Sequence, residues 1–91
     1  MITDITVIYN DPSVRDTIED LDFSFPVFIE YLDRGSKLSK KKAKELMEEW
    51  GATQLPFIIL KDKDKVVKCL YTEATNVINE LTDIIYGNKV Y

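Results

Sequence analysis

Apolar residues recur along this chain with two different spacings, and the two spacings alternate. Residues 3–9, TDITVIY, carry apolar side chains at every second position and are rich in β-branched residues, which predicts a strand. Over residues 12–20 the apolar side chains recur every three or four positions, which predicts a short amphipathic helix. Asp11 is suited to cap this helix, and Pro12 to occupy its first position.

The next apolar stretch, residues 24–32, alternates again and predicts a second strand. Pro26 cannot donate a ladder hydrogen bond, so we expect it at the start of this strand or on a sheet edge. An aromatic cluster surrounds this proline and consists of Phe23, Phe25 and Phe28. We expect most of the cluster to be core, and any part left exposed to be a contact patch. Residues 33–36, DRGS, predict a turn.

Residues 38–50 predict a second helix, with Ser36 or Ser39 as its N-cap. Its buried stripe is expected to consist of Ala43, Leu46, Met47 and Trp50. Its polar face opposes the helix dipole, with cations first and anions last: Lys37, Lys40, Lys41, Lys42, Lys44, Glu45, Glu48 and Glu49. The lysines suit either a docking patch for an acidic partner or a solvated helix face, and the second is the simpler interpretation.

A third strand is predicted over residues 57–60, which follow Pro56. Its unbroken apolar run indicates burial on both faces. We expect a charged hairpin turn over residues 61–65 and an antiparallel fourth strand over residues 66–71.

A last helix is expected to open at Thr72 or Glu73, and Gly87 is a suitable residue to end it. Its apolar face is predicted to contain Ala74, Val77, Ile78, Leu81, Ile84 and Ile85. The tail, residues 88–91, is expected to be loosely held.

The predicted order of elements is β-α-β-α-β-β-α. A right-handed crossover makes the first two strands parallel, and the terminal hairpin adds an antiparallel pair. The sequence therefore predicts an α/β fold, in which a mixed four-stranded sheet carries helices on both faces.

The length of 91 residues and an apolar content of 45% suit one domain with one core, residues 1–91. The net charge of −4 argues against nucleic acid, whose phosphates are neutralised by Lys and Arg. No apolar run reaches the ~20 residues of a membrane span, and the start, MITDITVIYN, lacks the pattern of a secretory signal. We therefore expect a small acidic cytoplasmic protein that binds neither nucleic acid nor membranes.

Two residue types that carry much of enzyme chemistry are scarce in this chain. Cys69 is the only cysteine and there is no histidine, which excludes an internal disulfide and a Cys-x-x-Cys pair. A His-dependent nucleophile triad and a His-ligated zinc site are excluded as well, and we expect no metal site. Cys69 itself is expected to be a small buried apolar residue.

Residues 50–60, WGATQLPFIIL, together with the charged turn that follows, resemble the thioredoxin-like superfamily at glutaredoxin size. That family has a helix end here, then a short linker, a cis-proline before a buried strand, and a hairpin. The resemblance implies a thioredoxin-like fold and a cis bond between Leu55 and Pro56. Phe57 departs from the family pattern, which often has Thr there. The family's frequent glycine before the last helix is also missing from residues 71–73.

The redox cysteines of that family lie between the first strand and its helix, where a helix N-terminus lowers the pKa of the thiol. Here that place reads YNDPSVRD, and the best register puts Ser13 and Asp16 at the two cysteine positions. Thiol exchange at this site is therefore excluded, and no histidine is present to activate the serine. The resemblance implies a cleft that has lost its sulfur, with these candidate binding residues: Asn10, Asp11, Pro12, Ser13, Arg15, Asp16, Gln54, Leu55 and Pro56.

The favoured hypothesis is a redox-inactive accessory module with no catalytic residue and no cofactor. The backbone of Leu55 would pair with an extended peptide or protein segment. The alternative is a redox or glutathione-linked protein in which Ser13, Arg15 or Cys69 replaces the missing cysteines. In that case Arg15 substitutes for the basic residue with which the family commonly binds glutathione. A third hypothesis, an accessory protein of a phage or mobile element, rests only on the short lysine- and acid-rich style of the chain.

Overall fold

The chain folds as a small α/β structure built on a mixed four-stranded sheet. The computed structural model describes residues 2–21, 27–63 and 65–85. In these ranges the elements are β1 (Asp4–Ile8), α1 (Pro12–Glu19), β2 (Phe28–Tyr31), the 3-10 helix η1 (Leu32–Arg34), α2 (Lys40–Trp50), β3 (Phe57–Asp62), β4 (Lys65–Leu70) and α3 (Ala74–Ile85). The predicted order of strands and α-helices is confirmed, with η1 as an addition after β2.

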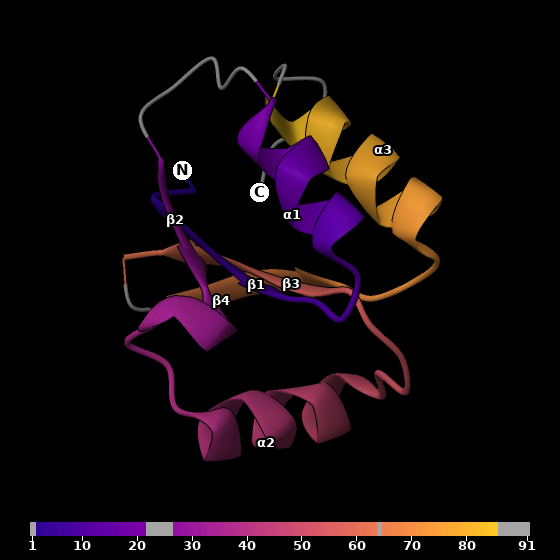
Figure 1. Cartoon of the computed structure of the whole chain (residues 1–91). Coiled ribbons are helices and arrows are strands. Elements are labelled where there is room, and N and C mark those ends of the chain that lie inside the picture. The colour runs from indigo at the N-terminus through magenta and orange to yellow at the C-terminus, as the bar shows by residue number, and fades with distance from the viewer. Residues whose placement is uncertain (1, 22–26, 64, 86–91) are drawn as a thin grey trace.

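The strands lie in the order β2-β1-β3-β4. β1 and β2 are parallel, with Ile5 opposite Ile29, whereas β3 is antiparallel to both β1 and β4. Helices α1 and α3 cover one face of the sheet, and η1 and α2 lie on the other (Figure 1). The predicted parallel first pair, terminal hairpin and coverage of both faces are therefore confirmed.

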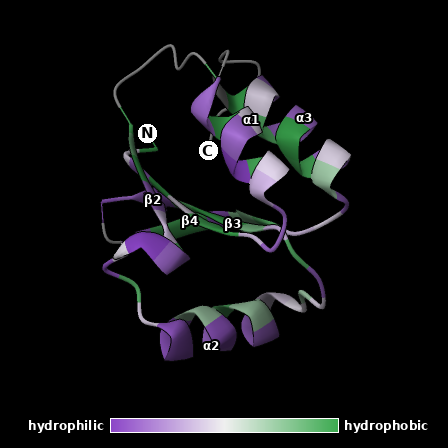
Figure 2. Ribbon diagram, viewed as in Figure 1, coloured by the Kyte–Doolittle hydropathy of each residue, from purple (hydrophilic) through white to green (hydrophobic). Residues whose placement is uncertain are grey.

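Each face of the sheet has its own apolar core. The α1/α3 face is filled chiefly by Ile2, Ile5, Val7, Val14, Ile18, Ile58, Leu60, Leu70, Val77, Leu81 and Ile84. The α2 face is filled by Ile8, Ala43, Leu46, Phe57, Ile59 and Cys69, with Met47 and Trp50 partly buried against them. Residues 57–60 have no exposed surface, because alternate side chains enter opposite cores. This confirms the burial expected from their unbroken apolar run, and Figure 2 shows β3 in the hydrophobic colours.

The helix ends follow local chemistry. Asp11 caps α1 by accepting a hydrogen bond of 3.0 Å from the Ser13 N–H, and Pro12 lies in the first turn. Of the two candidate caps for α2, Ser39 is the one used, because its Oγ accepts from the Lys42 N–H at 3.1 Å. Gly51 ends α2 at a φ of +74°, a left-handed conformation that glycine adopts at little cost.

Several predicted boundaries are wrong by a few residues. The hairpin is tighter than expected, because β3 continues through Asp62 and pairs there with Lys65, the first residue of β4. Lys63 reverses the chain at a φ of 57°. Leu32 begins η1 and does not end β2. Ala74 is exposed, and the buried positions of α3 begin at Val77.

Some predictions fall outside the described residues. They concern Phe23, Phe25 and Pro26, the stop at Gly87 and the tail of residues 88–91. Within the described ranges, no helix has both the length and the apolar character needed to cross a bilayer.

Truncation of Leu81 tests how α3 packs on the sheet. Leu81 has no exposed surface. Leu81→Ala should therefore lower the free energy of unfolding by ~2–5 kcal/mol, through lost burial and the cavity left behind. Urea denaturation measures this change. Asp83→Ala, at an exposed position of the same helix, is the control and should alter stability by less than ~0.5 kcal/mol. Similar small changes in both variants would contradict the packing described here.

Candidate functional site

Three connections meet at one end of the sheet. Ile8 is paired with Phe57, so the turn from β1 to α1 begins opposite Pro56. Ile58 is paired with Leu70, so the connection from β4 to α3 begins beside the start of β3. Figure 1 shows these connections side by side, at the end of the sheet where α1 and α3 begin. The register therefore brings together segments that lie far apart in the sequence.

One hollow lies between the segment before β3 and the start of α3. Its volume is about 450 Å³, and it is lined by Gly51, Thr53, Gln54, Tyr71, Thr72, Glu73 and Asn76. Leu55 follows Gln54 directly, and its side chain packs against the α2-face core. The backbone of Leu55 makes no hydrogen bond to any described residue. The Leu55–Pro56 bond is cis, as expected.

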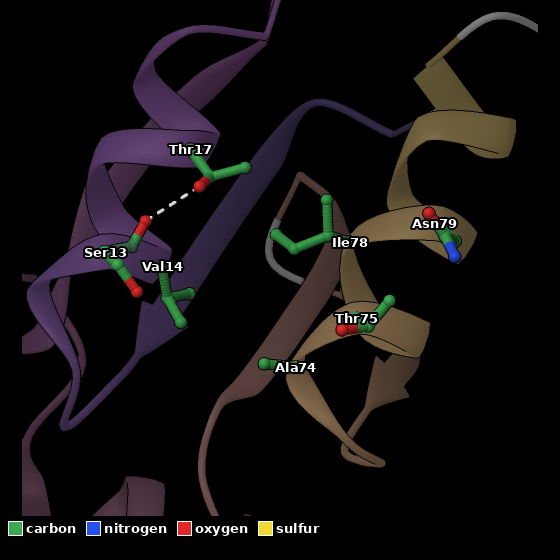
Figure 3. A pocket seen from close by; sticks show the side chains of 7 residues that line it. All are labelled: Ser13, Val14, Thr17, Ala74, Thr75, Ile78 and Asn79. Carbon is green, nitrogen blue, oxygen red and sulfur yellow. Dashed lines mark hydrogen bonds between the residues drawn. The ribbon is translucent and has the colours of Figure 1, made fainter.

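A second hollow, of about 260 Å³, separates α1 from α3. Its lining combines polar and apolar side chains: Ser13, Val14, Thr17, Ala74, Thr75, Ile78 and Asn79. Figure 3 shows the α1 and α3 residues facing each other across it, with the Thr17 hydroxyl donating to the Ser13 carbonyl at 2.8 Å. The first turn of α3 contributes to both hollows.

The nine predicted binding residues do not line one common hollow. Ser13 and Gln54 line different hollows, and the other seven predicted residues line neither. Asn10, Pro12 and Asp16 are exposed, whereas Pro56 is buried. The Asp11 carboxylate is occupied as the cap of α1. A cleft that uses all nine residues together stays a prediction.

Arg15, the proposed glutathione ligand, is engaged within the protein. Its guanidinium donates to the Tyr9 hydroxyl at 3.1 Å and lies 5.8 Å from the centre of the Tyr9 ring. The Tyr9 hydroxyl in turn donates to Asp33, just after β2, at 2.9 Å. The hydrogen bond with Tyr9 raises the pKa of Arg15 further. These contacts orient the guanidinium towards the β2 side of the sheet.

Tyr31 packs against Tyr9 and is the fourth member of a cluster that also contains Arg15 and Asp33. Its ring meets Tyr9 edge to face at 5.8 Å. Its hydroxyl is buried, and no described residue forms a hydrogen bond with it. Burial, with a smaller contribution from Glu19, raises the pKa of Tyr31 to about 12.

Cys69 lies within β4, opposite Ile59, and is only 3% exposed. Burial, together with the nearby charge of Glu49, raises the pKa of its thiol to about 12. A thiol in this environment stays protonated at neutral pH, and the protonated form is a weak nucleophile. The expectation of a small buried apolar residue is confirmed. Among the described residues, no group of three or more Cys, Asp or Glu side chains is placed to hold a metal ion.

Sequence reasoning missed the α3 side of the larger hollow, which is formed by Tyr71, Thr72, Glu73 and Asn76. The available signal was the switch from strand to helical periodicity at residues 71–74, beside the segment that contains Gln54. No protein-family model matches the chain, and no curated protein matches it.

Replacing each tyrosine of the cluster by phenylalanine separates a used hydroxyl from an unused one. Tyr31→Phe should leave the free energy of unfolding unchanged or raise it by up to ~1 kcal/mol, because it removes a buried hydroxyl that has no partner among the described residues. Tyr9→Phe should lower it by ~0.5–1.5 kcal/mol, because two hydrogen bonds are lost. Urea denaturation at neutral pH measures both. A larger loss for Tyr31→Phe than for Tyr9→Phe would contradict this assignment.

Proposed function

We propose that this protein is a thioredoxin-like, non-catalytic module that binds an extended peptide beside Leu55 and acts in the cytoplasm. The strand order β2-β1-β3-β4, with one parallel and two antiparallel pairs, supports the fold assignment. The α1/α3 layer on one face and α2 on the other support it as well (Figure 1). The motif in residues 50–60 adds a resemblance in sequence.

The unpaired backbone of Leu55 is the observation that carries the binding proposal. Its N–H and C=O make no hydrogen bond to a described residue, although they lie just before a buried strand. Backbone groups of this kind bind an extended peptide through main-chain hydrogen bonds, while neighbouring hollows accept alternate side chains. The hollow of about 450 Å³ beside Gln54 is suited to one such side chain.

The state of the one cysteine supports a role without thiol chemistry. Cys69 belongs to the α2-face core, whereas the hollows lie at the end of the sheet where α3 begins. Because the sulfur of Cys69 is buried, neither a disulfide partner nor a base in the solvent can reach it. Ser13 is exposed, and no histidine exists to activate its hydroxyl.

A matched pair of substitutions on α3 tests the location of the groove. Asn76 lines the larger hollow and Asn79 lines the hollow between α1 and α3, and both are exposed. Peptides selected from a random library against the wild-type protein are the probes. Asn76→Arg should weaken their binding at least ~10-fold, because the arginine fills the hollow beside Leu55, a loss of about 1.4 kcal/mol. Asn79→Arg should leave it within about twofold.

Calorimetry gives the dissociation constants, and amide exchange identifies the backbone groups that are protected. Protection of the Leu55 N–H on peptide binding is expected. Selection of no peptide, or equal binding by both variants, would overturn the proposed groove.

Insulin disulfide reduction and glutathione-dependent reduction distinguish this proposal from a redox role. Neither assay should exceed the buffer rate at neutral pH, because the Cys69 thiol is buried and protonated. Cys69→Ala, a small replacement in the same core, should behave identically. Activity in the wild type that disappears in Cys69→Ala would favour the redox alternative.

A further inference from the structure

Positive charge is concentrated at the start of α2 and in the segment before it. The cluster comprises Lys37, Lys40, Lys41, Lys42 and Lys44, all of them exposed. Lys42 forms the one ion pair that the described residues provide for the cluster, a loose contact of 3.9 Å with Glu45. Cations in the first turn of a helix also oppose its dipole, at a cost of ~0.3–1 kcal/mol each. A charge arrangement that disfavours its own helix is typical of a surface kept for another purpose.

An exposed aromatic side chain lies beside this lysine cluster. Phe28 is 56% exposed, and it is the one large hydrophobic side chain left exposed in the described part of the chain. The ammonium of Lys37 lies 5.9 Å from the centre of its ring, a cation–π contact. The Ser36 hydroxyl donates to Glu30, which ties the segment before α2 to β2. Phe28 and Lys37 therefore lie together on the α2 side of the sheet, and Lys37 is followed along the chain by the lysines that begin α2.

The same surface borders an edge of the sheet that the described strands leave unpaired. β2 is the outermost strand, and the Phe28 N–H points inward, donating to Thr3 of the β1 segment at 2.9 Å. Successive backbone groups of a strand alternate in direction, so those of Ile29 and Tyr31 point outward. No described residue forms a hydrogen bond with these outward groups. An unpaired edge of this kind is a template for one more strand.

We propose that β2 and the lysine cluster form a second binding surface, which takes an acidic extended peptide as a fifth strand beside β2. The peptide backbone pairs with the outward groups of Ile29 and Tyr31. Its acidic side chains, at alternate positions, face the α2 side and meet Lys37 and the start of α2. Its apolar side chains face the opposite side, where Ile29 and Tyr31 border the α1/α3 core. This surface is separate from the groove beside Leu55.

An acidic peptide suits this surface better than a nucleic acid, although both carry negative charge. The whole chain has a net charge of −4, which repels a long polyanion beyond the lysine cluster. The unpaired edge of a β-sheet binds through main-chain hydrogen bonds. A peptide provides the matching N–H and C=O groups, and a sugar–phosphate chain does not. The alternation between a charged face and an apolar face also matches the side-chain period of a strand.

The test uses a fluorescein-labelled peptide of alternating Glu and Val, about ten residues long, which is enough for one strand. Fluorescence anisotropy at low salt measures its binding to the whole protein. The same peptide with Lys in place of Glu, and an oligothymidylate of about twelve nucleotides, are comparison probes. The Glu/Val peptide should bind at least ~10-fold more tightly than either, and its binding should weaken with added salt.

Variants locate the surface. The double substitution Lys37→Glu with Lys40→Glu should weaken binding of the Glu/Val peptide at least ~10-fold, and Phe28→Ser should weaken it about threefold or more. Lys63→Glu with Lys65→Glu, in the β3–β4 hairpin at the opposite edge of the sheet, changes the net charge by the same amount, and this control should have an effect of less than about twofold. Circular dichroism and melting curves confirm that each variant is folded. If the double variant with Lys37→Glu and Lys40→Glu is not folded, Lys37→Glu alone takes its place.

Amide exchange of the wild-type protein provides evidence that does not depend on a variant. The Ile29 and Tyr31 N–H groups should become protected when the Glu/Val peptide is added, whereas the Leu55 N–H should not. Equal weakening by the control with Lys63→Glu and Lys65→Glu, preference for the oligothymidylate, or protection at Leu55 in place of β2 would each overturn the proposal. Absence of binding by the Glu/Val peptide would overturn it too.

Discussion

The burial of β3 between two helical layers is the constraint on which the rest of the structure depends. Residues 57–60 have no exposed surface, and each fully buried large apolar side chain contributes ~1.5–3 kcal/mol. Because the side chains of a strand alternate, this burial requires a covering layer on each face. Helices α1 and α3 supply one layer and α2 supplies part of the other (Figure 1). This arrangement brings the connections before β3, after β1 and after β4 to one end of the sheet.

What that end of the sheet provides for binding is two hollows and backbone hydrogen-bonding groups, in place of reactive side chains. Two hollows flank the first turn of α3, and the backbone beside one of them, at Leu55, has no described partner. The chain's one thiol lies elsewhere, within the α2-face core, where burial keeps it protonated. A peptide-binding role uses what this end provides, and a redox role would need chemistry from a residue that is buried away from it.

The charge distribution of α2 works against the helix itself. Considered by itself, a helix that begins with lysines and ends with glutamates is poorly matched to its dipole. Just before this helix, Lys37 borders the exposed ring of Phe28 on β2, the outermost of the described strands. A cost at the local level is then consistent with a role for the surface. The simpler interpretation of a solvated face did not include Phe28, whose exposure depends on the fold.

The sequence by itself determined the order of the elements, the cap at Asp11 and the two-sided burial of residues 57–60. These features depend on near neighbours and on the spacing of apolar residues. Only the tertiary structure decided which segments form the hollows, how Arg15 is engaged by Tyr9, and that Phe28 is exposed. Those outcomes depend on strand register and helix packing, which join residues far apart in the chain. A local pattern therefore cannot specify them.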